Sequence, residues 1–459
     1  MIYRLLVLGI FLLYQMSYGQ HLPMLKISND RNYIVTQDNE PFFWLGGTAW
    51  ELIHRLNREE VDIYLTDRAK KGFNVIQTVI LAELDGLDTP NAYGEKPLIN
   101  KDPTKVNEKY LEHVDYVLKK ASELGLYIGL LPTWGDKFNK KWGVGPEIFN
   151  SSNALIYGET IAERFLSHNN IIWILGGDRI PENENHYAII RAMAEGIKKV
   201  DSVHLMTYHP VGSKKAIDYF DEEWLDLDMY QSGHSRIAKE YSYVRESKQS
   251  KLVRPVINGE ARYENIPDRF WEDKTYGWLD DWDVRVSAYW SIIAGAAGYT
   301  YGCNDIWQMY DLNRTPIISA RTGWQAALDL PGSTHMKYMK EVFQLIDWQK
   351  MVYKPSLILN NNPEGEAHIV CAMGENQDIV VAYTPIGNPV KIDLSKMSSD
   401  KTKAYWYNPR SGKVSPIGTM ETSNPYEFKP WSSGRGSDFL LILVTEDFSI
   451  DLMEFNKRY

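Results

Sequence analysis

The fold is decided by a short apolar stretch, Ile171-Ile172-Trp173-Ile174-Leu175-Gly176-Gly177-Asp178. A continuous apolar run of this length is typical of a strand that is buried on both faces, as in a parallel sheet. A second stretch, Pro255-Val256-Ile257-Asn258-Gly259-Glu260, repeats the plan farther along the chain. Each apolar run ends at glycine, and one acidic residue follows. If both runs are strands of one parallel barrel, Asp178 and Glu260 point into the same mouth, because the carboxyl ends of the strands meet there.

Working outward from these stretches, apolar strands alternate with segments of helical period. Strands are predicted at Phe42–Gly47, Asn74–Ile80, Tyr127–Pro132, Ile171–Gly176, His204–Tyr208, Leu225–Tyr230, Pro255–Asn258 and Ala297–Gly302. Helices are predicted at Arg58–Lys71, Asn107–Leu124, Ala154–Leu166, Tyr187–Val200 and Asp283–Ala296. This alternation requires a parallel sheet, and eight strands favour a closed (β/α)8 TIM barrel. A doubly wound open sheet is the alternative, although no GxGxxG motif follows the first strand.

The pattern changes near residue 352. A long helical stretch is predicted at Trp324–Met351, and after it short strands alternate with turns, which indicates a small antiparallel β-sandwich. The predicted organisation is a signal peptide at 1–19, a barrel domain at 20–351 that begins with a hairpin at Leu25–Pro41, and a C-terminal sandwich domain at 352–459.

The first residues resemble an export signal. Arg4 precedes the apolar run Leu5–Tyr14, and Ser17-Tyr18-Gly19 offers small residues for cleavage before Gln20. A short membrane anchor or a buried first helix is the alternative, and the run is too short to span a bilayer as a helix. We expect residence in the periplasm rather than in the extracellular medium, and no later membrane span. The oligomeric state stays open.

Composition limits the classes of function. The net charge is −10, which argues against nucleic acid as a partner, because phosphates require a basic surface. The chain has 15 Trp and 29 Tyr, which suits sugar stacking but also suits a large core. Cys303 and Cys371, its two cysteines, fall in different predicted domains, so a disulfide is not expected.

The predicted strand ends supply the candidate site. Two facing carboxyl groups are the minimum for cleaving a glycosidic bond, and we assign Asp178 as acid/base and Glu260 as nucleophile. Arg262 follows Glu260 by two residues and should point to the same side, where its charge would favour an ionised nucleophile. The structural alternative is that each acid pairs with an arginine or caps a helix. Polar and aromatic residues at the other strand ends are predicted to bind substrate: Trp50, Glu51, Gln77, Trp134, Arg179, His209, Tyr230, His234, Arg262, Tyr263, Tyr301 and Trp307.

Other chemistries find little support in the sequence. His54, His209 and His234 stand alone, without HExxH or another paired ligand spacing, so no metal and no cofactor are expected. No G-x-S-x-G motif indicates a serine hydrolase. Asp283 and Arg285 begin the helix after the seventh strand, where capping and ion pairing explain them better than catalysis.

These motifs resemble a known family. Phe42–Glu51, Ile174–Asp178, Asn258–Glu264 and Ala288–Gly302 are similar to the apiosidase-like barrel domain, which includes glycoside hydrolase family 140. The segment Ala404–Lys413 resembles the small β domain usually attached to it, which carries a collagen-binding name that we do not transfer.

The resemblance implies a clan A barrel with catalytic carboxylates on strands four and seven, which are Asp178 and Glu260 here. It also implies a retaining glycoside hydrolase that acts on a complex plant or algal polysaccharide, as β-apiosidases act on side chains of the pectin rhamnogalacturonan II. Most clan A enzymes have an asparagine and a glutamate where this chain has Gly177 and Asp178. Two other functions stay open: a barrel that binds glycans without cleaving them, and an adhesion protein that holds matrix protein through its sandwich.

Overall fold

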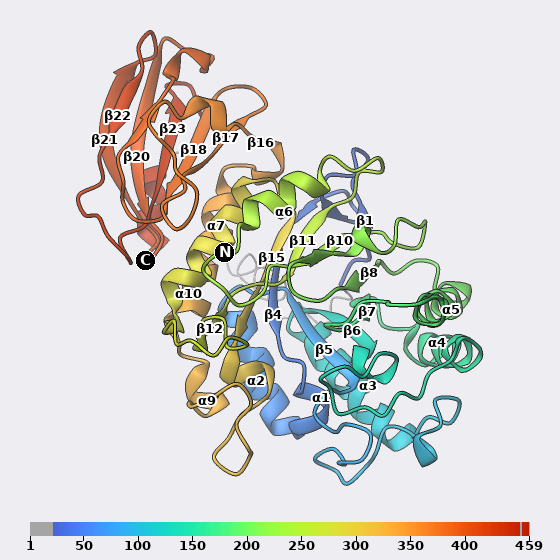
Figure 1. Ribbon diagram of the computed structural model, residues 1–459. Coiled ribbons are helices and arrows are strands. Elements are labelled where there is room, and N and C mark those ends of the chain that lie inside the picture. The colour runs from blue at the N-terminus through green and yellow to red at the C-terminus, as the bar shows by residue number, and fades with distance from the viewer. Residues whose placement is uncertain (1–21, 450–451, 459) are drawn as a thin grey trace, which may run out of the picture.

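A computed structural model describes residues 22–449 and 452–458 (Figure 1). The predicted signal peptide lies outside the described residues. The described chain begins with a small antiparallel sheet of β1 (Leu25–Ile27), β2 (Ile34–Thr36) and β3 (Pro41–Phe42). Its first two strands form the expected hairpin, to which β3 adds a third strand.

The central sheet follows the predicted alternation. Among the described residues, eight strands form its barrel: β4 (Trp44–Thr48), β5 (Val75–Leu81), β6 (Tyr127–Thr133), β7 (Ile171–Gly176), β8 (Met206–His209), β10 (Asp228–Gln231), β11 (Val256–Glu260) and β15 (Gly298–Cys303). They are ordered β8-β7-β6-β5-β4-β15-β11-β10, and the neighbours within this order are parallel. β7 and β11 are therefore the fourth and seventh strands, as predicted.

The barrel is nearly closed. Strand pairing is missing between β8 and β10, but the N–H of Asp226 donates to the Met206 carbonyl at 2.9 Å. The Thr207 hydroxyl donates to the Leu227 carbonyl at 2.8 Å across the same seam. These bonds join the two edges, so the fold is the predicted TIM barrel and not an open doubly wound sheet.

Helices surround the barrel on the outside (Figure 1). They are α1 (Leu52–Arg55), α2 (Arg58–Lys70), α3 (Glu108–Glu123), α4 (Ser151–Phe165), α5 (Glu184–Val200), α6 (Glu240–Ser247), α7 (Asp281–Ile293), α8 (Asn304–Trp307), α9 (Trp324–Ala327) and α10 (Pro331–Leu345). Two short pairings, β9 (Lys214–Lys215) with β10 and β12 (Tyr263–Glu264) with β15, extend the sheet, and β13 (Ile266–Pro267) pairs with β14 (Trp278–Leu279).

The helical stretch predicted at Trp324–Met351 is divided in the structure. α9 ends at Ala327, α10 runs from Pro331 to Leu345, and β16 begins at Met351. Proline has no N–H and is best placed in the first turn of a helix, so Pro331 starts a new helix rather than continuing the old one.

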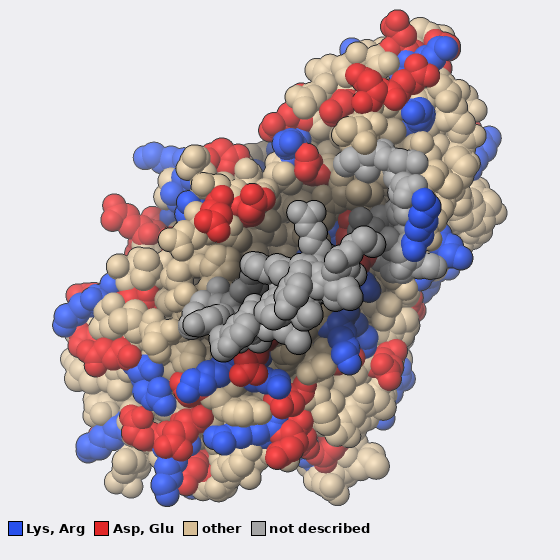
Figure 2. Space-filling view, turned by 180° about the vertical axis from the view of Figure 1, so that it is seen from behind, with Lys and Arg blue, Asp and Glu red and all other residues tan. Residues whose placement is uncertain are grey.

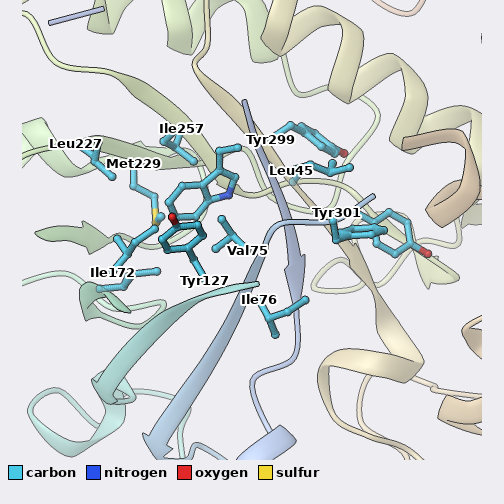
Figure 3. Packing of buried hydrophobic residues seen from close by; sticks show 14 of the residues in the cluster. Leu45, Val75, Ile76, Tyr127, Ile172, Leu227, Met229, Ile257, Tyr299 and Tyr301 are labelled. Atoms are coloured by element: carbon cyan, nitrogen blue, oxygen red, sulfur yellow. The ribbon is translucent and has the colours of Figure 1, made fainter. Parts of the chain in front are cut away.

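Apolar side chains fill the barrel interior. Figure 3 shows Ile172 of β7, Met229 of β10 and Ile257 of β11 packed together, and each is fully buried. This packing explains the continuous apolar runs in the sequence, because strands covered on both faces have no polar side. The interior is a filled core, so substrate access is confined to the loops at its carboxyl end.

The C-terminal part is antiparallel. A six-stranded sheet, ordered β16-β17-β18-β23-β20-β21, is accompanied by the ribbon of β19 (Val390–Ile392) and β22 (Tyr426–Phe428). The sheet contains β16 (Met351–Tyr353), β17 (Val370–Gly374), β18 (Ile379–Thr384), β20 (Lys401–Asn408), β21 (Lys413–Glu421) and β23 (Phe439–Thr445). One face of the sheet packs with the ribbon in a core of its own, which confirms the sandwich.

The other face of this sheet packs on the barrel. Tyr383 of β18 stacks on Tyr289 of α7 with ring centroids 4.6 Å apart, and the Tyr407 hydroxyl donates to the Tyr338 carbonyl of α10. Residues of both parts therefore share one hydrophobic core. The barrel and the sandwich form a continuous body, as the side-by-side ribbons in Figure 1 show.

The surface carries both charge signs. Lys and Arg side chains are interspersed with Asp and Glu over the face seen in Figure 2. None of the helices in the described ranges has the length and apolar character that crossing a bilayer requires. Cys303 and Cys371 are both buried and free.

Candidate active site

The end of β7 turns sharply to present Asp178. Gly176, Gly177 and Asp178 have positive φ angles of 90°, 101° and 52°. A Cβ on Gly176 would lie 2.5 Å from the His209 carbonyl oxygen, and one on Gly177 would lie 2.9 Å from the Gly135 nitrogen. Only glycine fits this path between the ends of the two neighbouring strands. The two glycines therefore fix where Asp178 leaves the strand.

The end of β11 presents Glu260 between two histidines. The Glu260 Oε2 atom lies 3.0 Å from His209 Nε2, and Oε1 lies 3.2 Å from His234 Nε2. His209 is the last residue of β8, so the strand-five end supports the strand-seven acid. The backbone N–H of Asp178 donates to the other ring nitrogen of His209 at 3.3 Å. One imidazole thus contacts both acid-bearing segments.

Both acids line one cavity of about 860 Å³ at the carboxyl end of the barrel. Five of the predicted substrate-binding residues line it with them: Trp50, Trp134, His234, Tyr263 and Trp307. The cavity is of the size that small-molecule and oligomer sites usually have. The sequence expected Asp178 and Glu260 to converge on one mouth, and the structure places them there.

The two carboxyl groups differ in their electrostatics. Burial and the charge of Glu260 raise the pKa of Asp178 to about 6, against the opposing charge of Arg179. Burial also acts to raise the pKa of Glu260, but its contacts with His209 and His234 outweigh burial and lower that pKa to about 2. Between these values, Asp178 keeps its proton while Glu260 is ionised. One group can donate a proton while its neighbour acts as a nucleophile.

Aromatic rings form the floor around His209. Trp50 and Trp134 have ring centroids 5.1 Å apart, and the Trp50 ring lies 5.3 Å from that of His209. The Trp50 indole N–H donates to the Tyr263 hydroxyl at 3.1 Å. His209 itself is fully buried and contacts Glu260 and the backbone of Asp178. Aromatic faces such as these suit the C–H faces of a sugar ring.

Three predicted substrate binders are buried partners of other strand-end groups. Glu51 pairs with His54 at 2.6 Å and accepts the Leu84 N–H, so it holds the loop after β5. Gln77 donates to the Gly259 carbonyl at 2.8 Å inside the barrel. Arg179 donates to the backbone and side chain of Asp178, at 2.8 and 3.2 Å. These groups support the site and do not line its cavity.

Three more point away from the cavity, which corrects the expectation from the sequence. Tyr230 contacts Ser291 on α7 at 2.9 Å, and the Tyr301 hydroxyl donates to Glu264. Arg262 forms two bonds with Glu240, at 2.8 and 3.0 Å, rather than facing Glu260. β11 ends at Glu260, so the alternation of an extended strand no longer fixes the direction of Arg262.

Several residues of the cavity wall were not predicted. Glu83 follows β5, and Trp142, Phe270 and Trp271 belong to loops around the mouth. Glu83 shows the signal used for Asp178, an acid just after an apolar strand, but the strand predicted from the sequence ends at Ile80, whereas β5 extends to Leu81. Burial and the charge of Asp178 raise the pKa of Glu83 to about 8, so it is neutral at pH 7. The loop tryptophans carry no periodic signal in the sequence.

The described residues contain no group of three or more His, Cys, Asp or Glu side chains arranged to hold a metal ion. The chemistry that the site offers with its own residues is acid/base and nucleophilic.

Comparison with known proteins identifies the family. Residues 28–350 match the family model "Apiosidase-like, catalytic domain", and residues 352–444 match "Putative collagen-binding domain of a collagenase". A crystal structure titled glycoside hydrolase family 5 from Bacteroides vulgatus is 32% identical, with a TM-score of 0.86, and the match covers 94% of this chain and 95% of that one. A second structure, titled glycoside hydrolase, is 32% identical with a TM-score of 0.85, over 94% of this chain and 98% of that one. No curated protein matches the chain. The chain therefore belongs to the apiosidase-like family and is a glycoside hydrolase.

Proposed function

We propose that this glycoside hydrolase cleaves its substrate with retention of anomeric configuration, with Glu260 as nucleophile and Asp178 as acid/base. The observation that carries the two roles is the pair of opposite pKa shifts in one cavity: about 6 for Asp178 and about 2 for Glu260. Retention itself rests on the match to the apiosidase-like family. A nucleophile must be ionised while the acid still holds its proton, and this pair meets both requirements in mildly acidic solution.

The reaction has two steps. Glu260 attacks the anomeric carbon while Asp178 transfers its proton to the leaving oxygen, which gives a glycosyl ester of Glu260 and a free alcohol. Asp178, now ionised, takes a proton from water as the water oxygen attacks the anomeric carbon and displaces Glu260. Each step inverts the anomeric centre, so the product has the configuration of the substrate.

The proposed substrate is a complex plant or algal polysaccharide, with apiose-linked side chains of pectin rhamnogalacturonan II as the first candidate. The family match supports an apiosidase-like activity, and the aromatic floor of Trp50 and Trp134 supports a carbohydrate ligand. We further propose that residues 1–19 direct export to the periplasm, which cell fractionation with an antibody to the mature chain tests.

The experiment is a screen of purified protein on plant and algal oligosaccharides, with proton NMR of the first product anomer. Retention supports the proposal, and an inverted first product overturns it. Glu260→Ala and Asp178→Ala should abolish turnover of these oligosaccharides without loss of fold. If the wild-type protein binds glycans and never releases a product, and both variants bind equally well, the barrel is a glycan-binding protein instead.

A further inference from the structure

The mouth of the cavity carries exposed aromatic rings on two separate loops. Trp142, after β6, is 64% exposed, and Trp271, between β13 and β14, is 58% exposed. Both line the cavity. Building on the proposed function, we infer that these two rings are sugar-binding platforms on opposite sides of the scissile bond. The substrate is then an oligosaccharide that continues beyond the cleaved linkage in both directions.

Trp142 belongs to the side of the acid. Its ring stacks on the Arg179 guanidinium at 4.0 Å from the centroid, and Arg179 in turn donates to Asp178. The Arg179 Nη2 atom also lies 3.8 Å from Glu83 of the cavity wall. Because Asp178 protonates the leaving oxygen, a ring next to it faces the sugar that departs. Trp142 is thus the platform for the leaving-group side.

Trp271 belongs to the side of the nucleophile. Its ring packs edge-on against Phe270 at 5.2 Å, and the Phe270 ring lies 6.1 Å from that of His234. His234 contacts Glu260 at 3.2 Å. Glu260 bonds to the sugar that stays on the enzyme. Because Trp271 is linked to Glu260 through Phe270 and His234, we expect its ring to stack on the next sugar of that same chain.

Two buried polar atoms of the wall lack a partner. Neither the Trp134 indole nitrogen nor the Gln231 side-chain oxygen forms a hydrogen bond with any of the described residues, although both residues are nearly fully buried and line the cavity. A buried polar group without a partner is costly, and a ligand that supplies hydroxyl groups removes that cost. One donor and one acceptor in a wall that also carries aromatic rings match a saccharide, whose rings are apolar on the face and polar at the edge.

The test compares two substrates with the same glycone. One is the shortest oligosaccharide that the wild-type enzyme cleaves from depolymerised pectin and hemicellulose, and the other is the 4-nitrophenyl monoglycoside. Binding of remote sugars contributes to kcat/KM only when those sugars are present. Trp142→Ala and Trp271→Ala should each lower kcat/KM about 10- to 100-fold more on the oligosaccharide than on the monoglycoside. Trp431→Ala is the matched control, because Trp431 is 59% exposed on the C-terminal domain.

A second measurement assigns the sides. The enzyme is first converted to its glycosyl ester with a 2-deoxy-2-fluoro glycoside, and its reactivation is followed in water with and without a disaccharide acceptor. The acceptor should speed reactivation of the wild type and of Trp271→Ala, but not of Trp142→Ala, because the acceptor occupies the leaving-group side.

Each outcome decides between the two proposals. Equal losses on both substrates, or acceptor-dependent reactivation of Trp142→Ala at the wild-type rate, overturn the two-platform inference. A wild-type enzyme that cleaves the monoglycoside but no oligosaccharide also overturns it, while the glycosidase mechanism stands. If neither substrate is cleaved and no ester forms, the proposed mechanism fails first, and the inference fails with it.

Discussion

The Nε2 atom of His209 lies 3.0 Å from the Oε2 atom of Glu260. The Nδ1 atom of the same ring accepts the backbone N–H of Asp178 at 3.3 Å, so a neutral His209 carries its proton on Nε2, facing Glu260. His234 is oriented differently: its Nδ1 contacts the Ala261 carbonyl at 3.0 Å and must donate to it. Its Nε2 lies 3.2 Å from the Oε1 atom of Glu260. The contacts with both histidines favour the charged form of Glu260.

The first prediction concerns the acid limb of the pH profile. His209→Ala and His234→Ala each remove a contact that lowers the pKa of Glu260. That pKa should rise from about 2 toward the ordinary glutamate value, so the acid limb of kcat/KM should move to higher pH by about one unit or more. Initial rates on an aryl glycoside between pH 2.5 and 6 measure the shift. His168→Gln is the control. His168 pairs with Asp115 and lies before the first residue of β7, at the other end of that strand from Asp178. Unmoved acid limbs in both variants would refute the role given to the two rings.

The second prediction concerns the basic limb. The pKa of Asp178 is about 6, so kcat/KM of the wild-type enzyme should fall above pH 6 as the acid loses its proton. Asp178→Ala should remove this limb on a 2,4-dinitrophenyl glycoside, whose leaving group needs no proton. Azide should then accelerate the variant and give a glycosyl azide of retained configuration, because a small anion can reach the ester without base assistance. A basic limb near pH 6 that persists in Asp178→Ala would show that another group titrates there.

The third prediction uses Glu83 as a probe of burial. Burial and the charge of Asp178 raise the pKa of Glu83 to about 8, whereas the unfolded chain has an ordinary glutamate. An acid with a raised folded pKa contributes stability that is complete below the unfolded pKa near 4.5 and is lost as pH rises to 8. Glu83→Gln does not titrate. It should match the wild type at pH 4 and exceed it at pH 8, by about 4 kcal/mol.

Urea unfolding at pH 4, 6 and 8 measures this difference. Glu147→Gln serves as the control, because Glu147 follows the Trp142 loop and is exposed. The Glu83→Gln variant should also keep most of the wild-type activity at pH 6, where Glu83 is already neutral. A constant stability difference across the range would show that Glu83 ionises normally in the folded protein.

The two acids could be predicted from the sequence because buried parallel strands leave an unambiguous pattern. β7 has the same bounds as its prediction, and the break at Gly176 and Gly177 marks where the strand opens. The rim could not be predicted in this way. Trp142 and Trp271 lie in loops. The position of Trp142 depends on its contact with Arg179, which is distant in sequence, and that of Trp271 depends on Phe270, in a segment without a periodic pattern.

The direction of Arg262 and the break in the predicted helical stretch have the same physical source. Arg262 lies beyond Glu260, where β11 ends, and Pro331 begins a new helix inside that stretch. Periodicity describes the interior of an element, and it fails at the residue where the element ends. Glu83 escaped notice because its strand extends to Leu81, one residue beyond the predicted end.

The last prediction concerns the junction of barrel and sandwich. Arg285 of α7 forms two hydrogen bonds with Asp438, both at 2.9 Å, and the Tyr383 hydroxyl donates to the same carboxylate. Arg285 and Asp438 are almost fully buried. Asp438→Ala leaves a buried arginine without its partner across the junction, which typically costs about 3–5 kcal/mol. Thermal and urea unfolding should show a large loss of stability.

The control for this junction is an exposed pair that also joins the two parts. Lys239, the N-cap residue of α6 between β10 and β11, contacts Glu364 of the C-terminal part, and both side chains are exposed. Glu364→Ala should leave the unfolding midpoint nearly unchanged, because solvent screens such pairs. The double variant Arg285→Met/Asp438→Leu should recover much of the stability lost in Asp438→Ala, since it removes the unpaired charge and keeps the apolar packing. If Asp438→Ala is as mild as Glu364→Ala, the shared apolar core alone holds the sandwich on the barrel, and the buried ion pair does not stabilise that junction.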